Sequence, residues 1–350
     1  MIENEKLLKI NTVKDRLKGD TLIAAHHYQN PEIVKCADLV GDSYKLAHLI
    51  SKSSARNIIL CGVNFMAESA AILAREDQKI FIPDSDALCP MAEMADIKVV
   101  EKVYEMLRSR YNIDLVPVVY VNSYIDLKNF VGREGGSTCT SSNAKIILQY
   151  YLKKNKKILF LPDYFLGANT ANAIKDVNAR KIIENGEIED FDNDYVKEIN
   201  IFLWDGFCPI HQQFTLNDIL VLRKNYPEIK VIVHPESKEE VVNNSDYYGS
   251  TEYIYDMIKK SKKGSVWGVG TEGTFVQRLA LENPDKKVIP LRDARCFNMA
   301  KINLDKLLDT LQAISDNKAE KYQVKVENNL KINASKALNK MIEIVESSRI

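Results

Sequence analysis

Six cysteines are the residues of this chain best suited to bind a metal, and no two of them form a CxxC pair. Three of them, Cys89, Cys208 and Cys296, each lie just beyond a short apolar run, in the loops CPMAEMA, GFCPIH and ARCFNM. Without a CxxC pair, a zinc ribbon or thioredoxin-like motif is not expected. A metal site must therefore be assembled from single ligands that are distant in sequence, and three thiolates favour a soft metal or an iron–sulfur cluster.

A cubane cluster normally takes four thiolates, so three protein ligands would leave one iron open to a substrate oxygen. That iron would act as a Lewis acid and help a hydroxyl group to leave. The competing interpretation is a zinc ion bound by the three cysteines and His211, which lies in the same loop as Cys208. Cys36 and Cys61 are interpreted as small buried hydrophobic residues, and Cys139 lies in the loop TCTSSN, where its role stays open.

Polar side chains end three other apolar runs, which are typical of buried strands. Histidine suits proton transfer near neutral pH or donation to a carboxylate, and tyrosine and glutamate are candidate acid–base groups. Packing for Tyr28 and turn capping for Glu236 are the alternatives. The side chains at these strand ends are His26, Tyr28, Tyr120, Asn122, His234 and Glu236.

Three similar segments position these groups. Each has an apolar run, an amphipathic stretch and a small hydroxyl residue that is expected to open a helix. His26 precedes Ser43 by the same number of residues as His234 precedes Thr251, and the middle segment is longer by an insert at Gly132–Gly136. The segments begin near Ile23, Val118 and Val231, and their hydroxyl residues are Ser43, Ser141 and Thr251.

The second half of each segment also repeats, as a strand, a helix and a strand followed by one of the three cysteines. A polar, acidic surface insert around Asn185–Glu198 lengthens the middle copy. Strands that alternate with helices predict parallel sheets, and ligands bind beyond the carboxyl ends of such strands. We therefore expect an α/β fold of three homologous three-layer αβα domains around a pseudo-threefold axis, with the active site at the central junction. The expected boundaries are 1–112, 113–226 and 227–305, with a C-terminal helix and tail at 306–350.

Helix starts at the three hydroxyl residues would serve a second purpose besides N-capping. Free N–H groups and the positive end of the helix dipole suit a small ligand that carries carboxylates or a phosphate. The chain contains no Walker A motif, and a nucleotide cofactor is not expected.

Composition sets the broad class. The chain has 350 residues, with 48 Lys and Arg balanced by 48 Asp and Glu, so no net field favours nucleic acid or an anionic membrane. The charged N-terminus does not read as a signal peptide, and no apolar run approaches the ~20 residues that span a bilayer. We expect a cytoplasmic protein with neither nucleic-acid nor membrane partners.

An ordered set of motifs then resembles the quinolinate synthase family along Ile23–Leu304. The motifs are AHHYQNPEI, ADLVGDS, VNFMAES, CPMAEMA, YVN, TSSNA, LFLPDYFLG, WDGFCPIH, VIVHPE, GST, VGTEG and CFNM. The resemblance implies one [4Fe–4S] cluster per chain on Cys89, Cys208 and Cys296, with the fourth iron open to substrate. It implies condensation of iminosuccinate (iminoaspartate) with dihydroxyacetone phosphate to quinolinate, phosphate and water, in de novo NAD biosynthesis. It also suggests transient contact with an L-aspartate oxidase or aspartate dehydrogenase that supplies the imine.

Carried over position by position, the resemblance divides the candidate residues by role. Three of them, Tyr28, Glu236 and His211, are implied in catalysis. The implied substrate-binding residues are His26, Ser43, Tyr120, Asn122, Ser141, His234, Glu236 and Thr251.

Some positions depart from the family pattern. Asn64 stands where histidine is frequent, Ala168 stands where a basic or polar residue is common, and the insert Gly132–Gly136 near Ser141 is expected to alter a lid. The C-terminal CxxC of some members is absent. The rival hypotheses are a non-catalytic sensor or binding module and a zinc-dependent hydrolase.

Overall fold

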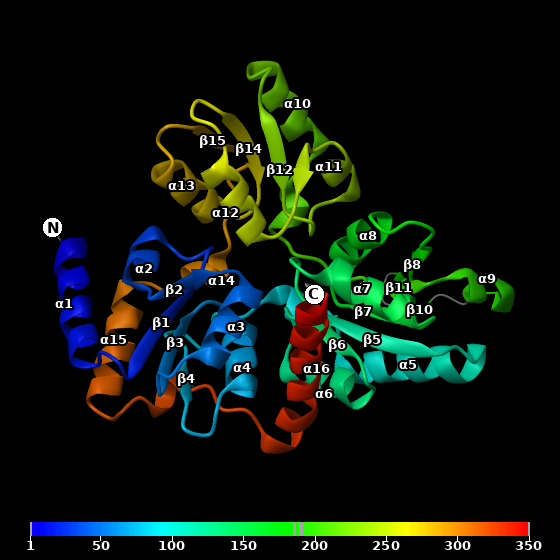
Figure 1. Cartoon of the computed structure of the whole chain (residues 1–350), viewed down its shortest axis with the longest axis horizontal. Helices are drawn as coiled ribbons and strands as arrows, with labels where there is room; N and C mark the ends of the chain where they lie inside the picture. Colours follow the sequence, from blue (N-terminus) through cyan, green and yellow to red (C-terminus); the bar gives the residue numbers. More distant parts are fainter. Residues whose placement is uncertain (1, 185–186, 189–191, 349–350) are drawn as a thin grey trace. The chain divides into compact units, whose positions relative to one another are not determined.

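The described residues of the computed structural model, 2–184, 187–188 and 192–348, contain three parallel sheets (Figure 1). The first sheet has the strand order β2-β1-β3-β4 and the third has the order β13-β12-β14-β15. The second sheet repeats this order as β6-β5-β7-β11 and adds β8 at its edge. The three segments identified by spacing therefore share one topology, and the predicted α/β class with layers of helices and parallel sheets is confirmed.

The bounds of the elements follow the repeats. The strands are β1 (Thr21–His26), β2 (Leu39–Gly41), β3 (Asn57–Cys61), β4 (Lys79–Phe81), β5 (Leu115–Tyr120), β6 (Ser137–Cys139), β7 (Lys157–Leu161), β8 (Ala179–Lys181), β9 (Ile183–Glu184), β10 (Glu187–Ile188), β11 (Ile201–Leu203), β12 (Lys230–Val233), β13 (Tyr247–Tyr248), β14 (Val266–Gly270) and β15 (Lys287–Pro290). The α-helices are α1 (Ile2–Arg16), α2 (Pro31–Cys36), α3 (Ser43–Lys52), α4 (Asn64–Leu73), α5 (Ile97–Tyr111), α6 (Ile125–Arg133), α7 (Ala144–Leu152), α8 (Tyr164–Asn172), α9 (Asn193–Glu198), α10 (Leu216–Asn225), α11 (Glu239–Asn243), α12 (Thr251–Lys260), α13 (Gly273–Glu282), α14 (Phe297–Ala300), α15 (Leu304–Ser315) and α16 (Asn328–Ser347). Three short 3-10 helices are η1 (Pro90–Glu93), η2 (His211–Gln213) and η3 (Glu320–Tyr322).

Each repeat contains an edge strand that sequence periodicity did not predict. β2, β6 and β13 lie between the amphipathic stretch and the following helix, and each pairs with the first strand of its repeat. They are two or three residues long, too short for alternation of apolar and polar residues to be visible. Cys139 is consequently the last residue of β6, fully buried, and does not lie in a loop.

Local sequence signals explain where the helices begin and which face they bury. The carboxylate of Asp96 accepts the N–H groups of Lys98 and Val99 and so caps α5. Along the same helix Val100, Val103, Tyr104, Leu107 and Tyr111 are buried at helical spacing, and Asn112 ends it in the left-handed conformation. This helix contributes to the core around the second sheet.

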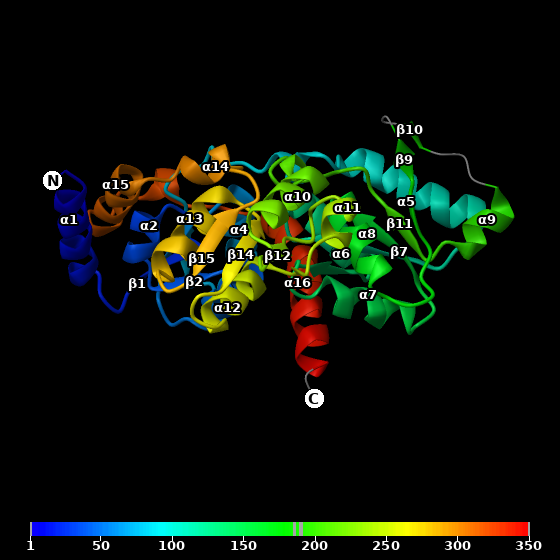
Figure 2. The same cartoon turned by 90° about the horizontal axis from the view of Figure 1, so that it is seen from above.

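The segment expected to form a C-terminal helix and tail contains α16, which packs on the second unit's fold. α16 packs against α6 and β6, and Figure 2 shows α16 beside α6. Its residues Ala337, Leu338 and Met341 are fully buried. A Cβ atom on Gly132 of α6 would lie 1.9 Å from the backbone oxygen of Asn333 in α16. Gly132 therefore permits close helix packing, whereas an effect of the insert Gly132–Gly136 on a lid stays a prediction.

The chain divides into two compact units. One comprises residues 1–89, 220–232 and 251–326, and the other comprises 90–219, 233–250 and 327–350. The predicted domain boundaries and the pseudo-threefold axis stay predictions. The predicted insert Asn185–Glu198 falls partly outside the described residues. Within the described part of the chain, no helix has the length and apolar character that crossing a bilayer requires.

Candidate functional site

The three cysteine loops are fastened to the fold in the same way. In each repeat, the first residue of the helix after the third strand donates its backbone N–H to the carbonyl two residues before the cysteine. The pairs are Asn64 with Ala87 at 2.7 Å, Tyr164 with Gly206 at 2.8 Å, and Gly273 with Ala294 at 2.7 Å. Cys89, Cys208 and Cys296 therefore occupy equivalent positions in the three repeats.

Exposure separates the six thiols into two groups. The three loop cysteines are partly exposed, whereas Cys36, Cys61 and Cys139 are buried. Burial raises the pKa of each of these three buried thiols and also that of Cys296, so exposure and not pKa separates the two groups. Because a metal needs a reachable thiolate, the loop cysteines suit ligation and the buried ones suit packing.

Two strand-end histidines adopt the same local structure. The backbone N–H of Tyr28 donates to Nδ1 of His26 at 3.1 Å, and the backbone N–H of Glu236 donates to Nδ1 of His234 at 3.4 Å. A neutral imidazole whose Nδ1 accepts carries its proton on Nε2. Both rings therefore offer an N–H donor on the side opposite their own turn.

Glu236 is the centre of a buried polar cluster in the second unit. One of its carboxylate oxygens lies 2.7 Å from Nδ1 of His211, and His211 stacks on His234 with ring centroids 4.4 Å apart. Burial alone would raise the pKa of Glu236. The neighbouring imidazoles, with hydrogen bonds from His211 and Tyr120, outweigh burial and hold that pKa at about 2. Burial lowers the pKa of His234 to about 3, so this ring is neutral.

A second buried carboxylate, Asp163, lies in the same unit. Burial, and then the charge of Glu236, raise its pKa well above the ordinary value. The two carboxyl groups therefore disfavour each other's ionisation, because two buried negative charges repel.

Tyr28 belongs to a hydroxyl chain in the first unit. Its hydroxyl accepts a hydrogen bond from Thr251 at 3.1 Å and shares another with Thr271 at 2.7 Å. The ring of His26 meets that of Tyr28 edge-on, with centroids 4.6 Å apart. Thr271 was not singled out in the sequence, although it follows β14 at a strand end in the motif VGTEG.

His27 is committed to the scaffold. Arg278 donates to its Nδ1 at 2.8 Å, so Nε2 carries the proton and donates to Glu252 at 2.9 Å. Lys45 reaches the other carboxylate oxygen of Glu252 at 2.8 Å. Burial lowers the pKa of His27, which keeps it neutral within this network.

Three further predicted residues, Ser43, Ser141 and Asn122, follow strands, and the structure agrees with the prediction for some of them only. Ser43 is the first residue of α3, but the N-cap is Asp42, whose side chain accepts from the N–H of Lys45. Ser141 lies in the turn before α7, which begins at Ala144, so the expectation that Ser141 opens a helix is wrong. The side-chain oxygen of Asn122 is buried without a hydrogen-bond partner in the described part of the chain, as expected of an atom that awaits a ligand.

One group of side chains could hold a single metal ion. Ligand atoms of Cys208, His211 and Glu236 lie within 4.8 Å of one another. Two of these residues are already hydrogen-bonded to each other, so a cation there would have to replace that bond.

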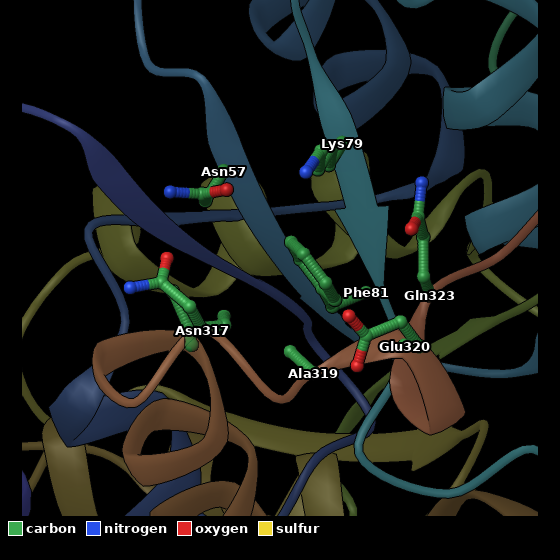
Figure 3. Close-up of a pocket in the computed structure, with 8 residues that line it drawn as sticks. Asn57, Lys79, Phe81, Asn317, Ala319, Glu320 and Gln323 are labelled. Carbon is green, nitrogen blue, oxygen red and sulfur yellow. The ribbon is translucent and has the colours of Figure 1, made fainter.

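The first unit contains a cavity whose lining includes none of the predicted site residues (Figure 3). It has a volume of about 120 Å³, and Asn57 and Lys79, which begin β3 and β4, line it together with Glu320 and Gln323. The predicted site residues instead follow the carboxyl ends of strands, where parallel sheets bind ligands.

Fold and site together define an α/β protein with three repeated parallel sheets, whose strand ends carry histidines, carboxylates and accessible thiols. Residues 8–343 match the family described as Quinolinate synthetase A protein. Quinolinate synthase of Bacillus cereus (strain Q1) is 39% identical over 349 residues, covering 96% of this chain and 92% of that protein. Quinolinate synthase of Listeria innocua serovar 6a is 39% identical over 348 residues, covering 98% of this chain and 95% of that protein.

The chain therefore belongs to the quinolinate synthetase A family and is an enzyme. Among solved structures, E-1-hydroxy-2-methyl-but-2-enyl-4-diphosphate reductase from Plasmodium falciparum covers 89% of this chain and 94% of its own. With 15% identity and a TM-score of 0.29, that likeness supports no inference.

Proposed function

We propose that this enzyme condenses iminosuccinate with dihydroxyacetone phosphate to give quinolinate, phosphate and water, in de novo NAD biosynthesis. The relatives named quinolinate synthase cover nearly the whole chain, which supports this assignment. The observation that carries it is the identical fastening of three cysteine loops at the carboxyl ends of three equivalent sheets.

The donor set fits an iron–sulfur cluster. Three partly exposed thiols occupy equivalent loops, and the other thiols are buried. We assign Cys89, Cys208 and Cys296 as the ligands of one [4Fe–4S] cluster per chain. When bound, such a cluster would supply a Lewis-acidic iron with a coordination position open to a substrate oxygen.

Substrate anions would be bound by N–H and O–H donors at the strand ends. His26 and His234 would each donate from Nε2, and Thr251 starts the ten-residue helix α12, whose N-terminus favours negative charge. Asn122, Ser43 and Ser141 would complete this set. Iminosuccinate carries two carboxylates and its partner carries a phosphate, so several such donors are needed.

Proton transfer would use the carboxylate–imidazole pair. Glu236 is ionised at neutral pH and can only accept, so Nδ1 of His211 donates to it and the ring is held in one orientation. Protons would then be taken up and released at Nε2 of His211, while Tyr120 donates to Glu236. In the first unit, Tyr28 would relay a proton along its hydroxyl chain with Thr251 and Thr271.

The imine substrate hydrolyses readily, so a supplying enzyme is part of the proposal. An L-aspartate oxidase or aspartate dehydrogenase in the same cytoplasmic compartment would deliver it through transient contact. The balanced charge of the chain supports neither nucleic acid nor an anionic membrane as a partner.

Anaerobic purification tests the proposal. A brown protein with broad absorption near ~400 nm, about four irons per chain, and quinolinate formation in a coupled assay would support it. A colourless protein that contains zinc would instead favour an ion held by the cysteines and His211. A protein that contains the cluster but forms no quinolinate would favour the sensor hypothesis.

A further inference from the structure

Two buried carboxylates occupy equivalent positions beside the cysteine loops. The residue before the helix that fastens each loop is Val63 in the first repeat, Asp163 in the second and Glu272 in the third. Asp163 accepts the N–H of Leu166 at 2.6 Å and Glu272 accepts the N–H of Phe275 at 3.0 Å. Each carboxylate therefore caps its helix.

Each of the two carboxylates also interacts with the backbone N–H of the cysteine itself. The N–H of Cys296 donates to the other oxygen of Glu272 at 3.1 Å, and the backbone N–H of Cys208 lies near enough to Asp163 to act against the rise of its pKa. Both contacts cross from the start of a helix to a loop that lies more than twenty residues further along the chain. Val63 has no side-chain acceptor, so Cys89 lacks this particular contact.

Capping alone does not explain these side chains. Asp163 is fully buried and Glu272 is 1% exposed, and an isolated buried charge is costly. Glutamate is not among the preferred N-cap residues, and its longer side chain spans the distance to Cys296 while it still reaches the helix. Val63 shows that the same helix start forms without a carboxylate.

We propose that Asp163 and Glu272 are positioning residues, which fix Cys208 and Cys296 so that their thiolates can hold the cluster. The inference rests on the proposed function for the identity of the cluster, but the fixing of the two loops is a property of the protein alone. Both carboxylates act through the cysteine backbone and need no contact with substrate.

The experiment begins with the metal-free full chain. Glu272→Val places in the third repeat the valine that the first repeat has at this position, Val63. Asp163→Val makes the same change in the second repeat. Alkylation of each thiol by iodoacetamide is followed by mass spectrometry of its peptide. We expect Glu272→Val to raise the alkylation rate of Cys296 about tenfold and leave Cys208 unchanged, as for loss of one hydrogen bond from the cysteine backbone. Asp163→Val should raise the alkylation rate of Cys208 and leave that of Cys296 unchanged.

Two further variants separate positioning from stability. Glu272→Gln retains a side-chain oxygen, so the alkylation rate of Cys296 should return toward that of the unmodified chain. Asn303→Ala removes the N-cap of α15, which accepts the N–H of Lys306 at 3.1 Å, and should change neither rate. Equal acceleration at Cys208 and Cys296 in Glu272→Val, or acceleration in Asn303→Ala, would overturn the proposal.

Iron binding is the second readout. After anaerobic reconstitution with iron and sulfide, Glu272→Val should lose iron to a chelator about tenfold faster than the unmodified chain, whereas Asn303→Ala should not. Equal rates of loss would overturn the role of Glu272 toward the cluster. If the unmodified chain takes up no iron, the proposed function fails, and the alkylation rates alone still decide whether the carboxylates fix the loops.

Discussion

Replacing Gly132 by alanine tests how closely α16 packs on α6. The added Cβ would lie 1.9 Å from the backbone oxygen of Asn333, 2.6 Å from its carbonyl carbon and 3.3 Å from the nitrogen of Ala337. The first two distances are far below a nonbonded contact, and backbone atoms cannot rotate away. The two helices must therefore separate, although Ala337, Leu338 and Met341 are fully buried at this interface.

The expected loss follows from two opposing effects. Overpacking of a well-packed interior costs about 1–3 kcal/mol, and here the obstacle is backbone, which places the cost at about 3 kcal/mol or above. Alanine is the better helix former by about 1 kcal/mol, which offsets part of this. The net destabilisation of about 2 kcal/mol corresponds to a fall in Tm of roughly 4–8 °C.

Thermal unfolding followed by circular dichroism measures this fall. Asn333→Ala is the control, because it removes the hydrogen bond to Asn129 at 3.2 Å but leaves the backbone oxygen in place. The double variant should lose the sum of both effects, since trimming the side chain cannot relieve a backbone clash. A Tm for Gly132→Ala equal to or above that of the unmodified chain would refute the reasoning.

Three further changes test the site and its support. Cys208→Ser should abolish iron binding whereas Cys36→Ser should retain about four irons per chain, and unchanged iron in the Cys208 variant would show the ligand assignment to be wrong. Tyr28→Phe should lower quinolinate formation by roughly 100-fold at unchanged iron content, measured in the coupled assay. Although burial raises the pKa of Glu252, hydrogen bonds from His27 and Lys45 outweigh this and hold it at about 2, below the ordinary 4.5. Its ionised form therefore stabilises the fold fully above about pH 4.5, and this contribution is lost as the pH falls towards 2. Glu252→Gln should therefore lower the unfolding free energy by about 1–2 kcal/mol at pH 7, after discounting for partial exposure, and urea titrations should show this difference vanishing as the pH falls towards 2.

The repeats could be predicted from the sequence because apolar runs of four to six residues are visible to periodicity. Their strand-end residues His26, Tyr120 and His234 could be placed for the same reason. The edge strands β2, β6 and β13 could not, because two or three residues carry no period. The packed face of α16 was missed although Ala334, Leu338 and Met341 recur at helical spacing and are buried.

The partners of site residues were beyond sequence reasoning. Arg278 and His27 are far apart in the chain, and only the fold brings them to 2.8 Å. The fold likewise brings together Thr271 with Tyr28, and Glu272 with the backbone of Cys296, which are also distant in the sequence. Sequence pattern marks which residues lie at strand ends, whereas their hydrogen bonds depend on loops that carry no regular pattern.

The three repeats show how one backbone arrangement supports different chemistry. The bond from helix start to cysteine loop is a backbone bond in every copy, so it does not depend on the side chain and leaves that position open to substitution. The residue just before that helix is accordingly Val63, Asp163 or Glu272 in the three repeats. The residue at the end of the first strand is His26, Tyr120 or His234. The backbone would thus fix where three thiols lie, while the substituted side chains would determine how firmly each is fixed and which donors surround the substrate. Exchanging side chains between equivalent positions should therefore alter cysteine reactivity and substrate binding one repeat at a time, without loss of the fold.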